Sequence, residues 1–236
     1  MIQLDAVTDQ LELFGRKVTL FEDANFSLPP GRYALLSQTP EYHRPIIDVL
    51  AGVRPPLRGR VRISRSISWP LGRPAMVRGR AKGTAIIDLV ANLYDVDRHK
   101  ATEVVAMMVS RPAYIDQPMG TWPPYVRREF IFALGLVPNF DVYVIDTTIP
   151  FEESRFTRLW QALFEERLVG KSLILAAAHA KQLLDYCAKG LVYDASTLRI
   201  EPDLEQCIEQ YPVRPERSET GEVIITEAMN DPGIYF

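Results

Sequence analysis

The order of hydrophobic and polar residues along the chain predicts an α/β protein that begins with antiparallel strands. Residues 2–28 alternate between hydrophobic and polar side chains in short runs, which Gly15 interrupts. A short apolar strand at 33–36 then leads through a loop into a helix with one apolar face, which ends near residue 50. Further strands are expected at 60–65, 67–69, 140–146, 172–178, 190–194 and 197–200.

Helical spacing of apolar side chains alternates with these later strands. The run at 140–146 is apolar and β-branched, as in a parallel strand that is covered on both faces. Four prolines favour a loop at 112–124. The helices are expected at 84–94, 97–110, 125–136, 152–168 and 202–211, with another that starts near His179. Strands that alternate with crossover helices predict a mostly parallel sheet behind the antiparallel β portion.

Length and composition are those of one globular domain. The chain has 236 residues, of which 47% are hydrophobic and 24% are charged. We expect a domain at 1–211 with a helical subdomain at about 84–136, followed by a polar, acidic tail at 212–236. Cys187 and Cys207 are too few for a disulfide framework and lack metal-ligand spacing, so no metal site is expected from them.

Charge is distributed unevenly. Between Arg54 and Lys82 there are nine basic residues and no acidic one, whereas the rest of the chain has 18 basic and 30 acidic residues. This segment is either a surface that faces solvent or a partner, or an anion-binding face built from Arg73, Arg78, Arg80 and Lys82. Nucleic acid is a disfavoured partner because aromatic residues do not interleave with the basic ones.

The sequence gives no reason to expect direct insertion into a membrane. No stretch approaches the ~18 apolar residues that a spanning helix needs. The first residues are acidic and alternating, without the basic and apolar regions of a signal peptide. A cytoplasmic protein is expected, with any membrane contact made through a partner.

The segment 34–52 has the strand–loop–helix frame of a phosphate-binding loop without its usual residues. The pattern of such a loop is GxxxxGK[ST], in which glycine amides surround phosphates, lysine reaches the terminal phosphates and a hydroxyl holds magnesium. Ser37 and Tyr42 stand at the glycine positions, His43 stands at the lysine position, and Arg44 and Pro45 replace the hydroxyl residues. The sequence therefore keeps the frame and changes the chemistry.

Three further segments carry a family resemblance. With ISWPLG at 67–72, NLY at 92–94 and YCAKGLVYD at 186–194, the chain resembles the ATP-binding subunits of ABC transporters. It looks closest to those that export capsular or related cell-surface polysaccharides in Gram-negative bacteria. The resemblance covers about residues 1–211 and implies a P-loop NTPase-like core with a helical subdomain.

Two of the family's motifs are altered at the positions that the resemblance assigns to them. The glutamine of the Q-loop falls at Arg78, and the signature motif falls at 122–128. The family's serine and helix N-terminus would there face the γ-phosphate of the opposing subunit. Pro123 and Pro124 have no N–H to donate, and no serine is present.

The strand that ends at 146 keeps one expected carboxylate. Asp146 matches the aspartate that holds magnesium in the family, while Thr147 stands where a glutamate polarises the attacking water. His179 matches the switch histidine. Both matching residues also have a purely structural interpretation, because an Asp after a parallel strand often caps a turn and His179 lies where a helix begins.

Taken together, these replacements predict a protein without catalytic residues. The loss of two charge-assisted phosphate contacts and of the backbone amides around the phosphates costs about 4 kcal/mol or more, roughly a thousandfold in affinity, so we expect no physiological binding of ATP or Mg²⁺. The expected function is a catalytically inactive ABC-ATPase-like subunit, not an enzyme, that serves a polysaccharide exporter as a binding or regulatory module.

The expected partners are the exporter's membrane subunit, an intact ATPase subunit or a second copy of the chain. Through such a partner, the chain would lie at the inner face of the inner membrane. Two alternatives stay open: a protein of the same fold that binds another anionic or phosphorylated ligand through the Arg-rich segment 73–82, or a scaffold unrelated to transport.

Overall fold

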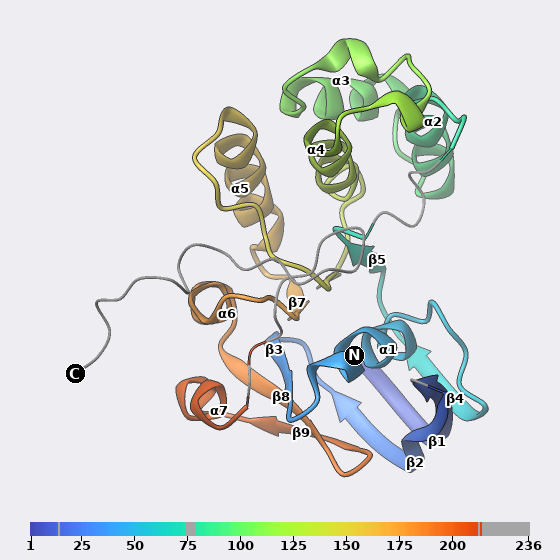
Figure 1. The fold of residues 1–236 in the computed structure, drawn as a ribbon, viewed down its shortest axis with the longest axis vertical. Coiled ribbons are helices and arrows are strands. Elements are labelled where there is room, and N and C mark those ends of the chain that lie inside the picture. Colours follow the sequence, from blue (N-terminus) through green and yellow to red (C-terminus); the bar gives the residue numbers. More distant parts are fainter. Residues whose placement is uncertain (14, 74–78, 212, 214–236) are drawn as a thin grey trace.

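The computed structural model describes residues 1–13, 15–73, 79–211 and 213. Their strands form two sheets (Figure 1). The smaller sheet is antiparallel, with the strand order β2 (Arg16–Leu28), β1 (Ile2–Leu13) and β4 (Arg58–Ile63). The larger sheet has the order β5 (Ile67–Leu71), β6 (Val142–Ile145), β7 (Ser172–Leu175), β3 (Arg32–Ser37), β8 (Lys189–Asp194) and β9 (Thr197–Glu201). In this sheet, β5, β6, β7, β3 and β8 run parallel to one another. Strand β9 lies at the edge and pairs antiparallel with β8.

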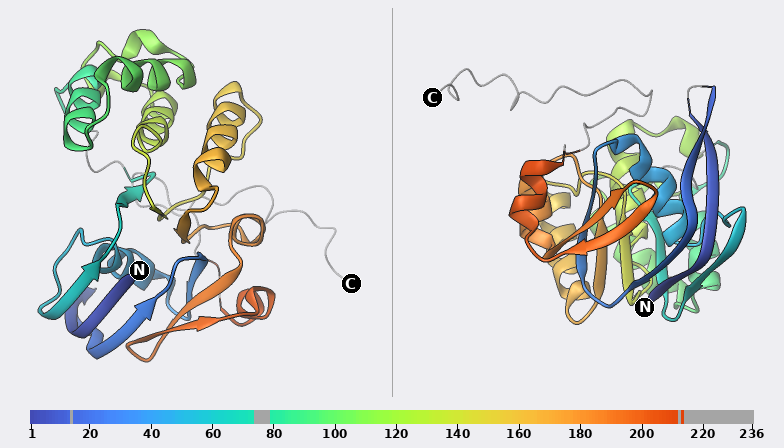
Figure 2. Two further views of the ribbon diagram at one scale, coloured as in Figure 1. Left: turned by 180° about the vertical axis from the view of Figure 1, so that it is seen from behind. Right: turned by 90° about the horizontal axis from the view of Figure 1, so that it is seen from below.

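The helices lie around these sheets. They are α1 (His43–Leu50), α2 (Gly83–Leu93), α3 (Arg98–Met108), α4 (Pro124–Leu134), α5 (Arg155–Leu168), α6 (Ala180–Tyr186) and α7 (Leu204–Gln210). Helices α2, α3 and α4 stand together beyond β5, on the opposite side of the molecule from the small sheet, and the view from behind shows the same separation (Figures 1 and 2). Helix α1 lies between the two sheets, and α6 and α7 lie beside β8 and β9.

The central strands are buried on both faces because their side chains alternate between two hydrophobic cores. In β3, Tyr33 and Leu35 pack with the small sheet and α1, whereas Ala34 and Leu36 pack with the core formed by α2 to α7. Strand β6 alternates in the same way. This period of two is the geometry of a pleated strand, and it explains why Val142–Ile145 has no polar face.

The predicted fold class is confirmed in its architecture of a mostly parallel sheet, an N-terminal antiparallel sheet and a helical part. The Pro-rich segment 112–124 contains only short 3₁₀ turns, at Pro112–Tyr114 and Met119–Thr121, before α4 begins. The division into a domain at 1–211 and a helical subdomain at about 84–136 stays a prediction. Apart from residue 213, the tail at 212–236 lies outside the described residues. In the described part of the chain, no helix combines the length and the apolarity that a membrane crossing requires.

Asp141 joins the starts of three neighbouring strands of the large sheet. Its Oδ2 accepts hydrogen bonds from the Ser66 N–H at 3.3 Å and the Ser66 hydroxyl at 3.0 Å, and its Oδ1 lies 2.9 Å from Lys171 Nζ. The hydrogen bond from Lys171, followed by that from Ser66, lowers the pKa of the Asp141 carboxyl below its ordinary value. Residues 66, 141 and 171 immediately precede β5, β6 and β7, so the ionised carboxylate fixes the relative start of these strands.

Asp141→Asn is expected to destabilise the protein in a pH-dependent manner. Because the folded-state pKa is lowered, the carboxylate's contribution is complete above the unfolded pKa of about 3.9 and is lost as pH falls through the folded pKa. The difference in melting temperature between the two proteins should therefore be constant from pH 7 to pH 5 and shrink below about pH 4. An equal difference at pH 7 and at pH 2.5 would contradict this expectation. Asp116→Asn, at an exposed loop residue, is the control.

Candidate functional site

The loop that follows β3 forms a closed turn. The Tyr42 N–H donates to the Thr39 carbonyl at 3.0 Å, and the His43 N–H donates to the Pro40 carbonyl. The Ser37 hydroxyl is buried and donates to the Thr39 carbonyl at 2.8 Å. These groups are therefore engaged within the loop, and the turn must open before the two amides can face a ligand.

The side chains of this loop divide between the interior and the surface. The Tyr42 ring packs edge-on against the Tyr193 ring, with centroids 5.8 Å apart, and the His43 imidazole is buried at the start of α1. Pro45 is half-buried, and Arg44 is exposed. The structure thus places a guanidinium at the N-terminal end of α1, where the helix dipole attracts anions.

A second arginine, Arg73, connects α1 to the end of β6. Its Nε and Nη2 lie 2.7 Å and 2.6 Å from Oδ2 of Asp146, the residue that follows β6. Its Nη1 pairs with Asp48 of α1, and its Nη2 also donates to the Arg44 carbonyl at 3.2 Å. The side chains of Arg73 and Asp146 are only 10% and 2% exposed. We refer to Arg73, Asp48 and Asp146 as the arginine clamp.

Gly72 brings the arginine clamp to this position. Its φ of +82° lies in the left-handed region, and a Cβ there would lie 2.1 Å from Thr147 Cγ2 and 2.9 Å from Phe132 Cζ. The chain leaving β5 therefore passes directly against the residue after Asp146. No larger residue fits, and the guanidinium of the next residue reaches the carboxylates because of this close approach.

The arginine clamp has the donor atoms that a divalent cation takes. Carboxylate oxygens are the preferred ligands of Mg²⁺, and here two of these groups from facing elements are bound to one positive charge. Within residues 1–13, 15–73, 79–211 and 213, no group of three or more His, Cys, Asp or Glu residues has metal-binding geometry. Both carboxylates are of the kind that Mg²⁺ accepts as ligands, but in this structure the guanidinium holds them.

The segment after Thr147 is tied to the start of α6. The Gln182 amide accepts a hydrogen bond from the Ile149 N–H at 2.9 Å and donates to the Ile149 carbonyl at 2.8 Å. The His179 ring packs edge-on against the Phe151 ring at 4.9 Å. These contacts hold the loop between β6 and α5 against the residues that precede and begin α6.

The remaining predicted site residues lie in the helical part or in the chain leading to it. Pro124 is the first residue of α4 and Pro123 precedes it, a position where a missing N–H costs a helix little. Arg80 and Lys82 are exposed just before α2. Arg78 lies outside the described residues. The anion-binding role predicted for these basic residues stays a prediction, and Arg73 is engaged by two carboxylates.

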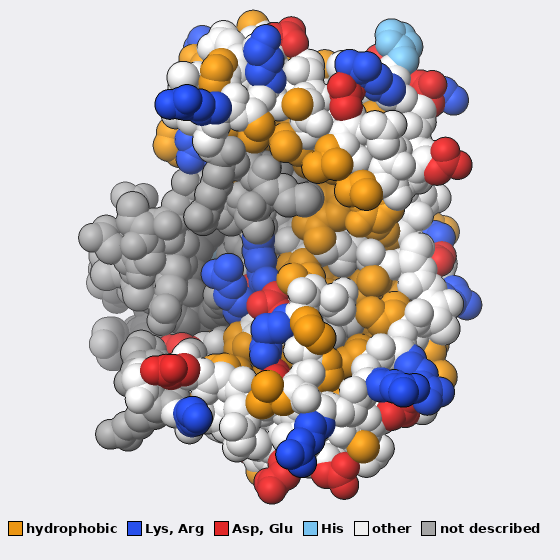
Figure 3. All heavy atoms as spheres, turned by 90° about the vertical axis from the view of Figure 1, so that its right-hand side faces the viewer, with side chains coloured by type: hydrophobic (Ala, Val, Ile, Leu, Met, Phe, Trp, Pro, Cys, Tyr) orange, Lys and Arg blue, Asp and Glu red, His pale blue; other side chains and the backbone are white. Residues whose placement is uncertain are grey.

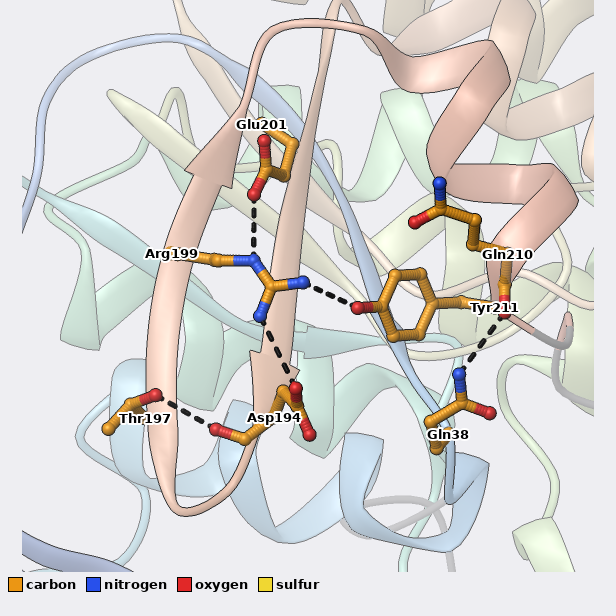
Figure 4. Close-up of polar contacts among 7 residues, drawn as sticks. All are labelled: Gln38, Asp194, Thr197, Arg199, Glu201, Gln210 and Tyr211. Atoms are coloured by element: carbon orange, nitrogen blue, oxygen red, sulfur yellow. Dashed lines mark hydrogen bonds and ion pairs between the residues drawn. The ribbon is translucent and has the colours of Figure 1, made fainter.

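The loop after β3 also contacts the C-terminal helix, which the sequence did not indicate (Figure 4). Gln38 Nε2 donates to the Gln210 carbonyl at 3.2 Å. The neighbouring Tyr211 is buried, and its hydroxyl lies 2.5 Å from Arg199 Nη2. Arg199 also bonds Glu201 at 2.7 Å. Asp48 was missed as well, although a lone carboxylate within the otherwise apolar run of α1 was an available signal.

Comparison with solved structures identifies the fold. One chain described as the ATP-binding subunit of an ABC transporter superposes with a TM-score of 0.65 at 11% identity, covering 89% of this chain and 92% of that one. A dimeric ATP-binding cassette bound to ADP and Pi superposes with a TM-score of 0.64 at 13% identity, covering 86% and 98%. The fold is that of an ABC ATPase.

Sequence relatives of this ABC ATPase-fold chain are named ATP-binding proteins. BexA of Haemophilus influenzae is 26% identical over 212 residues, covering 89% of this chain and 98% of BexA. The capsule polysaccharide export ATP-binding protein CtrD of Neisseria meningitidis is 26% identical, covering 82% and 90%. The polysialic acid transport ATP-binding protein KpsT of Escherichia coli is 24% identical, covering 83% and 89%. No protein-family model matches the chain. The resemblance predicted from the sequence is confirmed.

The relatives contradict two expectations drawn from the altered motifs. The chain was expected not to be an enzyme and to bind neither ATP nor Mg²⁺, yet relatives that match it over most of their length are named ATP-binding proteins. They point to nucleotide binding and to an ATPase. The expected loss of ATP affinity included the missing lysine and hydroxyl contacts. It did not include contacts that other groups, such as the Arg44 guanidinium, can make.

Gly72→Ala is expected to lower the free energy of unfolding by about 2 kcal/mol or more, because it combines a left-handed backbone with a steric overlap at Thr147. Chemical denaturation measures the loss. Gly170→Ala is the matched control, since Gly170 also has a positive φ of +69° but nothing within 4 Å of the added Cβ. Equal losses in the two variants would show that the contact with Thr147 contributes nothing.

Proposed function

We propose that this protein is the ATP-binding subunit of an ABC transporter that exports a cell-surface polysaccharide. The observation that carries the proposal is the near full-length similarity to ATP-binding proteins of which two are named for capsule polysaccharide export and polysialic acid transport. The ABC ATPase fold fits an ATP-binding subunit but does not indicate what is exported. Export then needs a membrane subunit, through which this chain lies at the inner face of the inner membrane.

In this proposal, the nucleotide binds beside the loop that follows β3. This loop and Asp146 lie at the carboxyl ends of the parallel strands β3 and β6, which is where open α/β sheets bind ligands. The exposed Arg44 guanidinium at the start of α1 supplies positive charge for the phosphates, and guanidinium suits them well. Opening of the 3₁₀ turn at Pro40–Tyr42 would release backbone amides toward the same ligand.

The membrane subunit is proposed to dock on an apolar surface formed by α2 and the adjoining part of β5. Leu89, Leu93 and Tyr94 are 47%, 65% and 39% exposed, and the Tyr94 ring lies 5.7 Å from that of half-buried Trp69. Seen from the side of α2 and β4, hydrophobic side chains gather between the helical part and the sheets (Figure 3). Such a contiguous apolar patch is typical of a protein–protein contact.

The second nucleotide-binding subunit of the transporter is proposed to be another copy of this chain or a separate ATPase subunit. Structures of the same fold include dimers.

Purified protein is expected to bind ATP, and Arg44→Glu is expected to weaken this binding by at least about tenfold, because it replaces an attraction to the phosphates with a repulsion. Isothermal titration calorimetry measures the affinity. Arg158→Glu, early in α5, is the matched control because it makes the same exchange at another exposed helical arginine. If the unchanged protein shows no heat of binding at millimolar ATP, the nucleotide half of the proposal is wrong.

The double variant Leu89→Glu/Leu93→Glu is expected to lose its membrane subunit during purification, since charges on the apolar surface would be buried without partners. Co-purification of the two subunits from detergent measures this loss. Val169→Glu, which changes a 75% exposed residue after α5, should leave the complex intact. If the double variant still purifies with the membrane subunit, the membrane subunit docks on a different surface.

A further inference from the structure

We propose that Arg73 and a divalent cation exclude each other at Asp48 and Asp146, so that Arg73 controls whether a metal ion can bind at this edge of the sheet. The inference rests on the proposed nucleotide function for its purpose. The competition itself involves only the arginine clamp and a metal ion, so it can be tested without any nucleotide.

The contacts of Arg73 are those of a resident cation. All three guanidinium nitrogens are engaged: Nε and Nη2 with Asp146, Nη1 with Asp48, and Nη2 also with the Arg44 carbonyl. Asp146 and Arg73 are nearly buried, and Asp48 is 20% exposed. A carboxylate this far from water requires a positive charge beside it, because burying an unpaired charge is costly.

A metal ion and the guanidinium compete for the same oxygen atom, Oδ2 of Asp146. Oxygen ligands lie about 2.0–2.1 Å from Mg²⁺. Two nitrogens of Arg73 lie 2.7 Å and 2.6 Å from the Asp146 oxygen that they share. An ion on that oxygen would lie within contact distance of the guanidinium and would repel it in surroundings with little water to screen the charges. Binding of the ion to Oδ2 of Asp146 therefore requires the Arg73 guanidinium to move away from that oxygen.

The backbone favours a movement of the side chain over a movement of the chain. Gly72 is fixed against Thr147 and Phe132, so the main chain entering residue 73 has little freedom. The guanidinium also donates to the Arg44 carbonyl in the first turn of α1, so a side chain displaced from the carboxylates still has an acceptor there. Exchange with a metal ion would thus shift one positive charge across the candidate site rather than remove it.

The test titrates Mn²⁺ into the nucleotide-free protein, with electron paramagnetic resonance to count free and bound ions. Arg73→Gln is expected to bind Mn²⁺ at least about tenfold more tightly than the unchanged protein, because the resident competitor has been removed. Adding Asp146→Asn to this variant should abolish the gain. A merely structural role of Arg73 would change the melting temperature but not the affinity for Mn²⁺.

Arg54→Gln provides the matched control. Arg54 also forms a two-point ion pair with a buried carboxylate, that of Asp9, but in the small sheet and without a second carboxylate. Its substitution should leave Mn²⁺ binding unchanged. Equal Mn²⁺ affinity in Arg73→Gln and the unchanged protein, or an equal gain in Arg54→Gln, would overturn the proposal.

If circular dichroism shows that Arg73→Gln does not fold, Arg73→Lys is tested in its place. An ammonium group keeps the charge but cannot make the same fork of contacts, so a smaller gain of about threefold is expected, and its absence would count against the proposal. Because no nucleotide is added, a failure to bind ATP would leave this result unaffected. The two proposals can therefore fail separately.

Discussion

The burial of the large parallel sheet on both faces is the constraint on which the rest of the structure depends. Strands β3, β6 and β7 alternate their side chains between two hydrophobic cores, so neither face can turn toward water. Because these strands are parallel, their carboxyl ends meet at one edge. The loop after β3 and Asp146 both lie at that edge for this reason, and their position does not depend on the type of side chain found there.

The negative charge at that edge is partly compensated from within the chain, by one guanidinium that contacts two carboxylates. Asp146 is almost removed from solvent, and Arg73 reaches it across 73 residues of sequence to form contacts that also include Asp48. Because Gly72 has no side chain, the backbone can pass close to Thr147, and Arg73 is near enough to contact Asp146. The loop after β3 has no lysine, and the guanidinium that lies next to it comes from a different segment and is already paired with two carboxylates.

Strand and helix positions followed well from the sequence because they reflect local periodicity and burial. The runs around β3, β6 and α5 were evident from their apolar spacing alone. The arginine clamp was not, because it depends on which loops the sheet order brings together and on a backbone conformation at Gly72. The contact of Gln38 with Gln210 has the same origin, since two polar residues 172 positions apart leave no periodic signal.

The strand order also delays the completion of the fold while the chain is being made. Strand β3 lies between β7 and β8, so both of its neighbours are synthesised about 140 residues or more after it. At ordinary elongation rates this is an interval on the order of ten seconds, during which an apolar strand with two open edges exists without its sheet. The antiparallel pair β1 and β2, by contrast, is complete within the first 28 residues and can form at once. Among the described strands, β1 and β2 are therefore the first pair that the growing chain can complete.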